Sequence, residues 1–335
     1  MLIIGNRAVH RALDGREAAV LQLVADTYRL HAASRTAVPH SVFLRFPGQP
    51  RDRIIGLPAY AGGPRPAAGM KWIASFPGNV AEGKERASAA ILLNSTEDGT
   101  PRACVEASVI SSRRTAASAA LAASVLVTEP EPAGIVLVGC GPINREVLRF
   151  TKAVLPSLRE VVLFDLDAGR ATEFARRAGA DHSDITFTVA SGLGEALAAH
   201  RLVSLATTAG EPHMDLTACA PGTTVLHVSL RDLTVQAVLD AQNVVDDADH
   251  VCRERTSLHL AEQATGGREF IDGSIGDLLG DGAGFRRDPA RTAVFSPFGL
   301  GVLDIALARW VHEECERREL GVRVDDFLPV PGAAS

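Results

Sequence analysis

Residues 134–144 read GIVLVGCGPIN, and this stretch decides the fold. Gly134-Ile135-Val136-Leu137-Val138 is a continuous apolar run, which predicts a strand buried on both faces. Gly139-Cys140-Gly141 then predicts a tight turn that opens into a helix from about Pro142 to Val154. Such a turn lets backbone N–H groups and a helix N-terminus meet a pyrophosphate. The stretch therefore predicts a dinucleotide-binding turn.

An acidic residue after the next strand supports this interpretation, although Asn144 replaces the third glycine of the usual pattern. Asp165 follows a predicted strand at Val161–Phe164, near the ~20-residue spacing expected for a carboxylate that binds ribose hydroxyls. An acid there repels a 2′-phosphate and favours NAD over NADP. The alternative is a glycine turn in another α/β domain, with Asp165 or Asp167 capping a helix.

Strands and helices alternate beyond this turn. A helix is predicted near Ala168–Ala178, and further strands at Ile185–Val189, Leu202–Ala206 and Thr224–Val228. Continuous apolar strands alternating with helices predict the α/β class, with a Rossmann-type doubly wound parallel sheet. The Glu-Pro-Glu-Pro run at residues 129–132 predicts a domain boundary just before the first strand of this sheet.

The first part of the chain has a different pattern of predicted elements. Short β-rich runs bounded by Pro or Gly predict strands at Ser41–Phe46, Arg53–Leu57, Lys71–Phe76 and Ala89–Asn94. An alanine-rich helix is expected over Ser111–Val127, and an amphipathic helix over Gly301–Arg318 should return to this part. We therefore expect an α+β domain from residues 1–128 and 302–335, and a Rossmann domain from residues 129–301.

Composition excludes several classes of protein. The 335 residues are 46% hydrophobic and 22% charged with a formal net charge of -6, which is typical of a soluble globular protein. Nucleic-acid binding is not expected because no unmixed basic cluster occurs, and no apolar run approaches the ~20 residues of a membrane span. Five widely spaced cysteines without a C-x-x-C pair predict reduced thiols in the cytoplasm and no metal site.

Three basic residues of the first domain form a candidate substrate site. Arg45 and Lys71 each occur inside an apolar strand, where a charge is costly unless it is paired, and Arg114 follows on the alanine-rich helix. Arginine binds carboxylates in a bidentate manner, and a lysine with a lowered pKa can transfer protons. Only three of the 34 Lys and Arg residues are lysine, so Lys71 stands out. The alternative is that these side chains simply face solvent.

A second candidate site follows the strands of the Rossmann domain. Thr207 and Asp232 come just after predicted strands, and ligands of doubly wound sheets bind at those carboxyl ends. Asp232 can face the cofactor, or cap the helix expected at Leu233–Leu239, or do both. His227 is interpreted as a core histidine.

Together these segments resemble the ornithine cyclodeaminase/mu-crystallin family. The resemblance runs over about residues 35–315 and rests on the segments FLRFP, GMKWIASFPGN, RASAAILLN, ISSRRTAASAALAA, VGCGPIN and HVSLRDL. KWIASFPGN and RASAAILLN most resemble the family's dehydrogenase of 2,3-diaminopropionate biosynthesis. Ornithine cyclodeaminases differ in the stretch after the lysine.

The resemblance implies an activity and residue roles. The activity is NAD-dependent oxidation of N-(2-amino-2-carboxyethyl)-L-glutamate by hydride transfer, followed by hydrolysis of the imine to 2-oxoglutarate and L-2,3-diaminopropionate. Arg45, Lys71 and Arg114 would bind substrate carboxylate, with Arg86 and Arg113 as further candidates, and Lys71 and Asp232 would be catalytic. The implied cofactor-binding residues are Thr115, Gly139, Gly141, Pro142, Ile143, Asn144, Asp165 and Thr207.

The resemblance also implies partners. We expect a homodimer joined through the substrate domains, and a pyridoxal-phosphate-dependent synthase upstream in siderophore or peptide-antibiotic biosynthesis. Within the family, ornithine cyclodeamination, another amino-acid dehydrogenase activity and ketimine reduction remain alternatives. A non-catalytic ligand-binding protein similar to mu-crystallin is the alternative from another class.

Overall fold

The computed structural model describes residues 1–280 and 284–329, which divide into two compact units. Unit 1 contains Met1–Arg114 and the chain from Leu300 onward, and unit 2 contains Thr115–Gly299. The first division falls within helix α3 (Ser108–Leu126), and the second falls just before helix α11 (Gly301–Arg317). The Pro-rich run at 129–132, where we expected the boundary, follows the end of α3.

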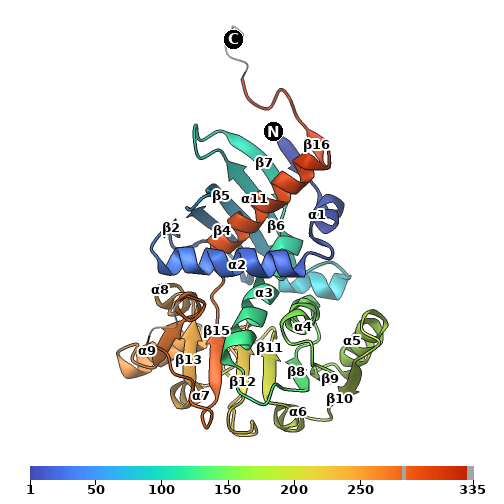
Figure 1. Ribbon diagram of the computed structural model, residues 1–335, viewed down its shortest axis with the longest axis vertical. Helices are drawn as coiled ribbons and strands as arrows, with labels where there is room; N and C mark the ends of the chain where they lie inside the picture. Colours follow the sequence, from blue (N-terminus) through green and yellow to red (C-terminus); the bar gives the residue numbers. More distant parts are fainter. Residues whose placement is uncertain (281–283, 330–335) are drawn as a thin grey trace. The chain divides into compact units, whose positions relative to one another are not determined.

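Unit 2 is built on a parallel sheet of the Rossmann type (Figure 1). The strand order is β10-β9-β8-β11-β12-β15-β13-β14, and every neighbouring pair is parallel. The strands are β8 (Gly134–Val138), β9 (Glu160–Phe164), β10 (Thr186–Val189), β11 (Leu202–Leu205), β12 (Thr224–His227), β13 (Gln242–Val245), β14 (Ile271–Ser274) and β15 (Ala293–Ser296). The helices are α4 (Pro142–Val154), α5 (Ala168–Asp181), α6 (Leu193–Ala199), α7 (Val235–Asp240), α8 (Ala248–Val251), α9 (Ser257–Thr265) and α10 (Ile275–Leu278). The predicted fold class is confirmed.

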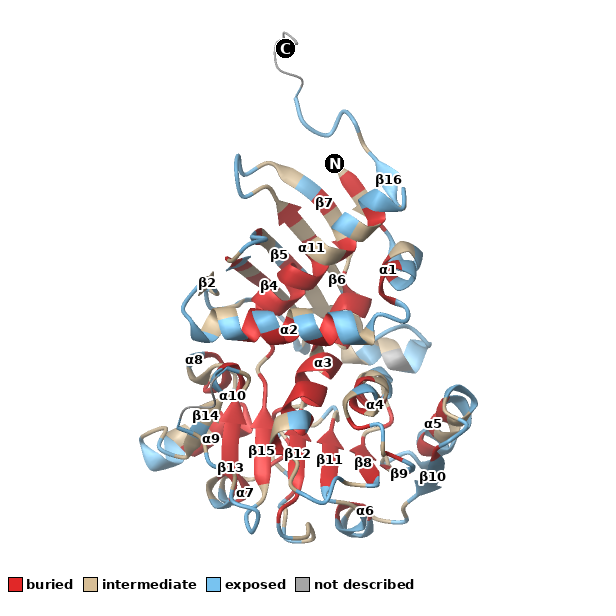
Figure 2. Cartoon of the chain, viewed as in Figure 1, coloured by how far each residue is buried: buried red, intermediate tan, exposed pale blue. Residues whose placement is uncertain are grey.

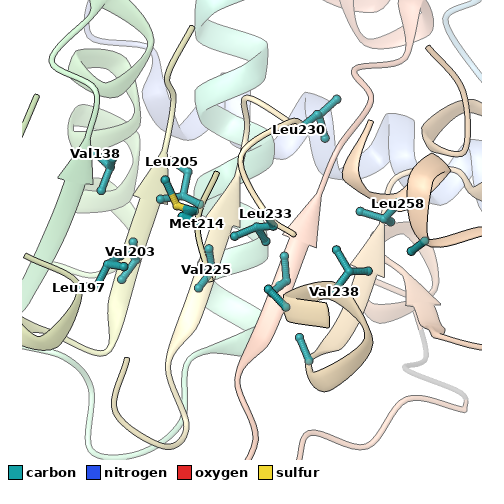
Figure 3. Close-up of a cluster of buried hydrophobic side chains, with 14 of the residues drawn as sticks. Val138, Leu197, Val203, Leu205, Met214, Val225, Leu230, Leu233, Val238 and Leu258 are labelled. Carbon is teal, nitrogen blue, oxygen red and sulfur yellow. The ribbon is translucent and has the colours of Figure 1, made fainter. Parts of the chain in front are cut away.

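The central strands of this sheet are the core of unit 2. Each residue of β8, β11, β12, β13 and β15 is buried (Figure 2). Their side chains join one hydrophobic cluster with residues of the covering helices, such as Leu197 and Val238 (Figure 3). Burial on both faces explains why these strands are mainly apolar and do not alternate between apolar and polar residues.

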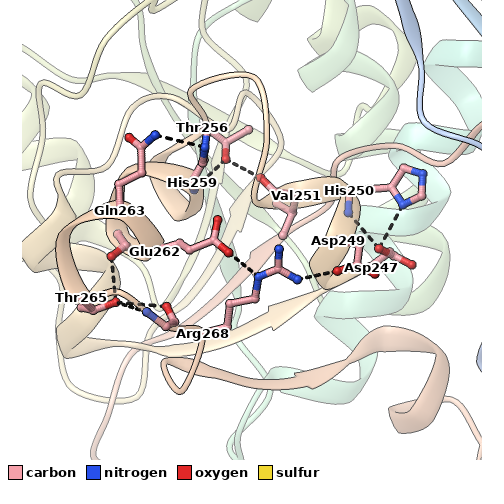
Figure 4. A network of polar contacts seen from close by, with 12 residues as sticks. Asp247, Asp249, His250, Val251, Thr256, His259, Glu262, Gln263, Thr265 and Arg268 are labelled. Atoms are coloured by element: carbon pink, nitrogen blue, oxygen red, sulfur yellow. Dashed lines mark hydrogen bonds and ion pairs between the residues drawn. The ribbon is translucent and has the colours of Figure 1, made fainter.

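Polar contacts hold the loops that follow β13. The Arg268 guanidinium binds Asp249 at 2.5 Å and Glu262 at 2.6 Å, and Asp247 lies 3.0 Å from the His250 ring (Figure 4). The buried Asp246 carboxylate accepts N–H bonds from Phe298 and Gly299, so it fixes the segment that ends unit 2.

Unit 1 contains a mixed sheet with strand order β16-β1-β7-β6-β5-β4-β2, in which β3 also pairs with β4. The strands are β1 (Leu2–Ile4), β2 (Thr36–Ala37), β3 (Val42–Phe46), β4 (Gln49–Ala61), β5 (Ala67–Ser75), β6 (Ala87–Asn94), β7 (Pro101–Glu106) and β16 (Val322–Arg323). Pairs are antiparallel except β1 with β7, which is parallel. β4 extends well beyond the strand predicted at Arg53–Leu57.

The two faces of this sheet differ in their cover. α11 packs on β4, β5 and β6 and against α2 (Glu17–Ala32), while α1 (Asn6–Leu13) packs beside α11 (Figure 1). Gly301 allows the close approach of α11, because a Cβ there would lie 3.1 Å from the Leu57 Cβ. We call the side under α11, which includes Leu57, Lys71 and Ile91, the inner face. The opposite, outer face exposes Val42, Leu44, Tyr60, Met70 and Trp72.

Among the described residues, no helix combines the length and the apolar character that crossing a membrane requires.

Candidate active site

Lys71, Arg114 and Asp304 form a buried ionic cluster in unit 1. The Lys71 Nζ lies 2.6 Å from Asp304 Oδ2, and the Arg114 Nε lies 3.1 Å from Asp304 Oδ1. Lys71 is 2% exposed and Asp304 is fully buried. Two cations thus share one carboxylate, each bound to a different oxygen, and the three groups carry a net positive charge. A small carboxylate has the charge that such a cluster attracts.

The environment of Lys71 suits proton transfer. Burial lowers the pKa of Lys71 from 10.5 to about 8; the Asp304 carboxylate opposes this shift and the Arg114 guanidinium adds to it. A lysine in this range exchanges its proton near neutral pH, as a general base must. Arginine at this position would stay protonated.

Asp304 was not predicted as a site residue from the sequence. Its signal is a single acid inside the apolar run Val302-Leu303-Asp304-Ile305-Ala306 of α11. A fully buried carboxylate needs cationic or hydrogen-bonding partners, so this Asp could have been matched with the two cations of the first domain.

The remaining predicted basic residues have different surroundings. Arg45 is exposed on β3, and its guanidinium carbon lies 5.3 Å from the centroid of the Phe43 ring. Arg113 is buried, and its Nη2 lies 2.5 Å from Asp14 Oδ1. Arg86 is exposed, and its carbonyl accepts the N–H of Phe76. The structure therefore groups Lys71 with Arg114 and not with Arg113.

In unit 2, the glycine turn follows β8 as the sequence predicts. Gly139 has φ +89°, and a Cβ there would lie 2.4 Å from the Ala206 carbonyl oxygen, so glycine is required. A Cβ on Gly141 would meet nothing within 4 Å. Gly141 is the N-cap of α4, Pro142 and Ile143 begin the helix, and no side chain caps it. Its first N–H groups have no acceptor inside the helix, so this helix end has the polarity that suits an anion.

Asn144 holds the turn from inside. Its Nδ2 donates to the carbonyls of Val138 and Gly139 at 2.9 and 2.8 Å, and its Oδ1 accepts from the Ser204 hydroxyl at 2.7 Å. The side chain is fully buried. Asn144 therefore supports the turn from inside the protein.

Asp165 closes the other side of the turn at the end of β9. One carboxylate oxygen accepts the Cys140 N–H at 2.8 Å, and the other accepts the Asp167 N–H at 3.0 Å. Burial and then the Asp165 charge raise the pKa of the Cys140 thiol to about 12, so it stays protonated. Asp167 itself caps α5. Thr115 is half-buried on α3, beside the boundary between the units.

Asp232 lies fully buried in a second polar cluster of unit 2. Its carboxylate accepts hydrogen bonds from the Thr207 and Ser229 hydroxyls, and His227 Nε2 lies 3.3 Å from Oδ2. Burial raises the pKa of this carboxyl, but His227, Ser229 and Thr207 together outweigh burial and lower the pKa from 3.8 to about 2. His227 also contacts the Ser296 hydroxyl at 3.1 Å, so this histidine is buried and partnered, as expected.

A parallel sheet with a glycine turn before a helix, and an acid after the second strand, defines a dinucleotide-binding Rossmann fold. The model of the ornithine cyclodeaminase/mu-crystallin family matches residues 18–319. The chain therefore belongs to this family.

Its relatives include oxidoreductases of amino acids. The chain is 25% identical to N-((2S)-2-amino-2-carboxyethyl)-L-glutamate dehydrogenase of Staphylococcus aureus, over 97% of this chain and 98% of the relative. It is also 25% identical to alanine dehydrogenase of Archaeoglobus fulgidus, with the same coverage. A solved structure of Thermococcus litoralis Delta(1)-pyrroline-2-carboxylate reductase, in complex with NADH and L-proline, superimposes with a TM-score of 0.90. That chain is 21% identical, and the match covers 97% of this chain and all of the other.

Proposed function

We propose that the chain is an NAD-dependent oxidoreductase that converts N-(2-amino-2-carboxyethyl)-L-glutamate to L-2,3-diaminopropionate and 2-oxoglutarate. The observation that carries the chemistry is the buried pair Lys71 and Arg114 sharing the single carboxylate of Asp304. The similarity to the staphylococcal dehydrogenase over 97% of the chain supports this substrate.

The residues of unit 2 fit a dinucleotide. The open space above Gly141 and the uncapped start of α4 suit a pyrophosphate, with the N–H groups of Gly141 and Ile143 as donors. Asp165 would bind the ribose hydroxyls and disfavour a 2′-phosphate, which supports NAD. Thr115 and Thr207 would complete the site. When bound, NAD supplies a hydride acceptor.

The groups of unit 1 would bind the substrate and move its proton. Arg114 and protonated Lys71 attract the carboxylate, whereas the neutral Lys71 amine takes the proton from the secondary amine as hydride leaves the glutamate α-carbon. The resulting imine adds water at that carbon. The carbinolamine then breaks its C–N bond, releasing 2-oxoglutarate and the amine of diaminopropionate.

Asp232 would serve this reaction in its ionised form. A carboxylate with a pKa of about 2 is a weak proton acceptor, so Lys71 is the better base of the two. Asp232 holds the Thr207 hydroxyl, and through it the loop after β11. We therefore assign Asp232 mainly to keeping a fixed negative charge and a fixed loop in the site.

We further propose that unit 1 is the substrate-binding and dimerisation domain. The outer face of its sheet exposes large apolar side chains on neighbouring strands, including Leu44 on β3, Tyr60 on β4, and Met70 and Trp72 on β5. Contiguous exposed apolar surface of this kind is typical of a protein interface. A second copy of the chain is the partner that the family resemblance favours.

The proposed setting is cytoplasmic biosynthesis of a siderophore or peptide antibiotic. Diaminopropionate would be the product consumed there, and a pyridoxal-phosphate-dependent synthase would make the conjugate. The widely spaced cysteines, which suit a reducing compartment, support the location.

The experiment is a side-by-side assay of NADH release with the conjugate, L-alanine, L-ornithine and L-proline. We expect turnover with the conjugate, giving 2-oxoglutarate and diaminopropionate in equal amounts. Lys71→Arg should keep the fold and lose about a thousandfold in kcat/KM, because the positive charge remains but the base is lost. The exposed Lys84, substituted to Arg, is the matched control.

Higher kcat/KM with alanine or ornithine would replace the proposed substrate with one of those. Tight NAD binding without turnover of any amino acid would favour a non-catalytic ligand-binding protein. Unchanged kcat/KM in Lys71→Arg would remove the lysine as the base.

A further inference from the structure

The Lys71 amine has a second hydrogen-bond partner besides Asp304. Its Nζ donates to the Ser111 hydroxyl oxygen at 3.4 Å and to Asp304 at 2.6 Å, and among the described residues these are its two acceptors. Ser111 lies on α3 three residues before Arg114, and residues at this spacing share one face of a helix. Ser111 therefore lies on the side of α3 that carries the buried ionic cluster.

Lys71 itself is almost closed to a substrate. It lies on the inner face of the sheet, where α11 packs on β5, and it is only 2% exposed. Asp304 is fully buried, so a proton passed to that carboxylate would stay inside unit 1. Ser111 is half-buried and is the less enclosed of the two acceptors. A proton can therefore enter and leave the cluster more readily through Ser111 than through Asp304.

The hydroxyl hydrogen of Ser111 provides a second observation. Serines inside helices commonly donate to a backbone carbonyl in the preceding turn. The adjacent Ser112 does so, to the Val109 carbonyl at 3.0 Å. Ser111 accepts from Lys71, but its hydroxyl donates to no acceptor among the described residues. Its hydrogen is thus available to another group while its oxygen stays on the lysine.

We propose that Ser111 is a further catalytic residue, whose hydroxyl relays a proton from the substrate amine to the buried Lys71. This inference rests on the proposed oxidation of an amino acid, and it holds for whichever amino acid the enzyme oxidises. Every such oxidation to an imine removes one proton from nitrogen.

The relay balances in protons and electrons. As hydride leaves the α-carbon for NAD, the substrate nitrogen gives its proton to Ser111 Oγ and keeps the electron pair that the imine requires. The hydroxyl hydrogen of Ser111 passes at the same time to the lone pair of the neutral Lys71 Nζ. Ser111 ends neutral, and Lys71 ends as the ammonium group that Asp304 holds. The 3.4 Å separation permits this transfer, because hydrogen bonds between catalytic groups commonly shorten when substrate binds.

The first test is the kinetics of Ser111→Ala, with the amino acid that the wild-type enzyme oxidises best. The variant loses the relay oxygen, so kcat should fall by about 100-fold while KM changes by less than about twofold, as expected for a group that moves a proton without binding the carboxylate. Alanine favours a helix, so the variant should fold. Ser111→Thr keeps a hydroxyl and should retain kcat within about fivefold.

Ser112→Ala is the matched control. Ser112 is the adjacent half-buried serine of the same helix, and its hydroxyl is occupied by the backbone, so kcat should change by less than about twofold. An unchanged kcat in Ser111→Ala would overturn the relay. Equal losses in Ser111→Ala and Ser111→Thr would overturn it as well, because the hydroxyl would then not be the group that matters.

A second measurement follows the proton path without any oxidation. The chain has three lysines, Lys71, Lys84 and Lys152, so labelling with ¹⁵N-lysine gives three side-chain amine signals in NMR spectra, and Lys71→Arg identifies the one from Lys71. We expect the Lys71 amine hydrogens to exchange with solvent about tenfold more slowly in Ser111→Ala than in the wild type, because the hydroxyl is their path outward. Ser112→Ala should leave the exchange rate unchanged.

The exchange rate separates the relay from the proposed function. Slower exchange in Ser111→Ala, in an enzyme that oxidises none of the amino acids tested, would support Ser111 as the proton path to Lys71 and show the proposed function to be wrong. Equal or faster exchange in Ser111→Ala would overturn the relay whatever the enzyme oxidises.

Discussion

The two polar clusters differ in how charge is balanced. In unit 1, two buried cations share one carboxylate, so the Lys71, Arg114 and Asp304 cluster keeps a net positive charge. In unit 2, a single buried carboxylate accepts from two hydroxyls beside a histidine, so the Asp232 cluster is satisfied within its own unit. The first arrangement has the charge that the proposed carboxylate substrate requires, whereas the second holds loops in place.

This difference in charge balance lowers the pKa of both Lys71 and Asp232, with opposite effects on their charged forms. Lys71 is destabilised as a cation, and its pKa falls to about 8. Asp232 is stabilised as an anion, and its pKa falls to about 2. Lys71 can therefore exchange a proton near neutral pH, whereas Asp232 stays ionised.

The largest effect should come from Asp304→Asn. It removes the carboxylate that Lys71 and Arg114 share, and breaking a buried ion pair in this way costs about 3–5 kcal/mol. Urea unfolding followed by tryptophan fluorescence measures this in unit 1, because both tryptophans, Trp72 and Trp310, belong to it. Asp26→Asn, which breaks an exposed ion pair with Arg29 in the same unit, should cost less than about 1 kcal/mol. Equal losses in the free energy of unfolding for the two variants would show that the buried cluster stabilises unit 1 no more than a surface ion pair does.

A second prediction concerns the stability of unit 1 at alkaline pH. Folded Lys71 releases its proton near pH 8, whereas the unfolded chain holds it up to about pH 10.5, so the unfolded state binds more protons in this window. The free energy of unfolding should therefore rise from pH 8 to 10.5, by about 3 kcal/mol. Lys71→Met should flatten this rise, and Lys84→Met should keep it. Parallel pH curves for wild type and Lys71→Met would contradict the lowered pKa.

The smallest effect should come from Asp232→Asn at acid pH. The Asp232 carboxyl has a lower pKa folded than unfolded, so its stabilisation is present above pH 3.8 and is lost as pH falls towards 2. The amount is about 2 kcal/mol. Acid unfolding followed by circular dichroism should show a shallower pH dependence in the variant. At neutral pH the variant should keep about a tenth of wild-type kcat; a thousandfold loss would make Asp232 the principal base instead.

Much of unit 2 could be predicted because its signals are local. The apolar run before Gly139 and the acid at Asp165 lie within one strand–turn–helix–strand unit, and both are placed as expected. The strands β13 and β14 were not predicted, because Gln242-Asn243 and Asp272-Gly273 interrupt their apolar pattern. The strand β15 was not predicted either.

The unit 1 site could be predicted only in part, because its partners are far apart in the chain. Lys71 was recognised as a charge inside an apolar strand and Arg114 as a basic residue of the alanine-rich helix, but Asp304 is more than 180 residues from either.

The residue that departs from the glycine pattern has a consequence for how the cofactor turn works. Since the Asn144 amide ties together two carbonyls of the turn and a hydroxyl of β11, the loop has its shape before any ligand arrives. Binding of a ligand at this turn then costs little conformational entropy of the backbone. The hydrogen-bonded side chain of Asn144 thus fixes the turn, as close packing around a third glycine does in the usual pattern. A search for the three glycines alone would not find this turn.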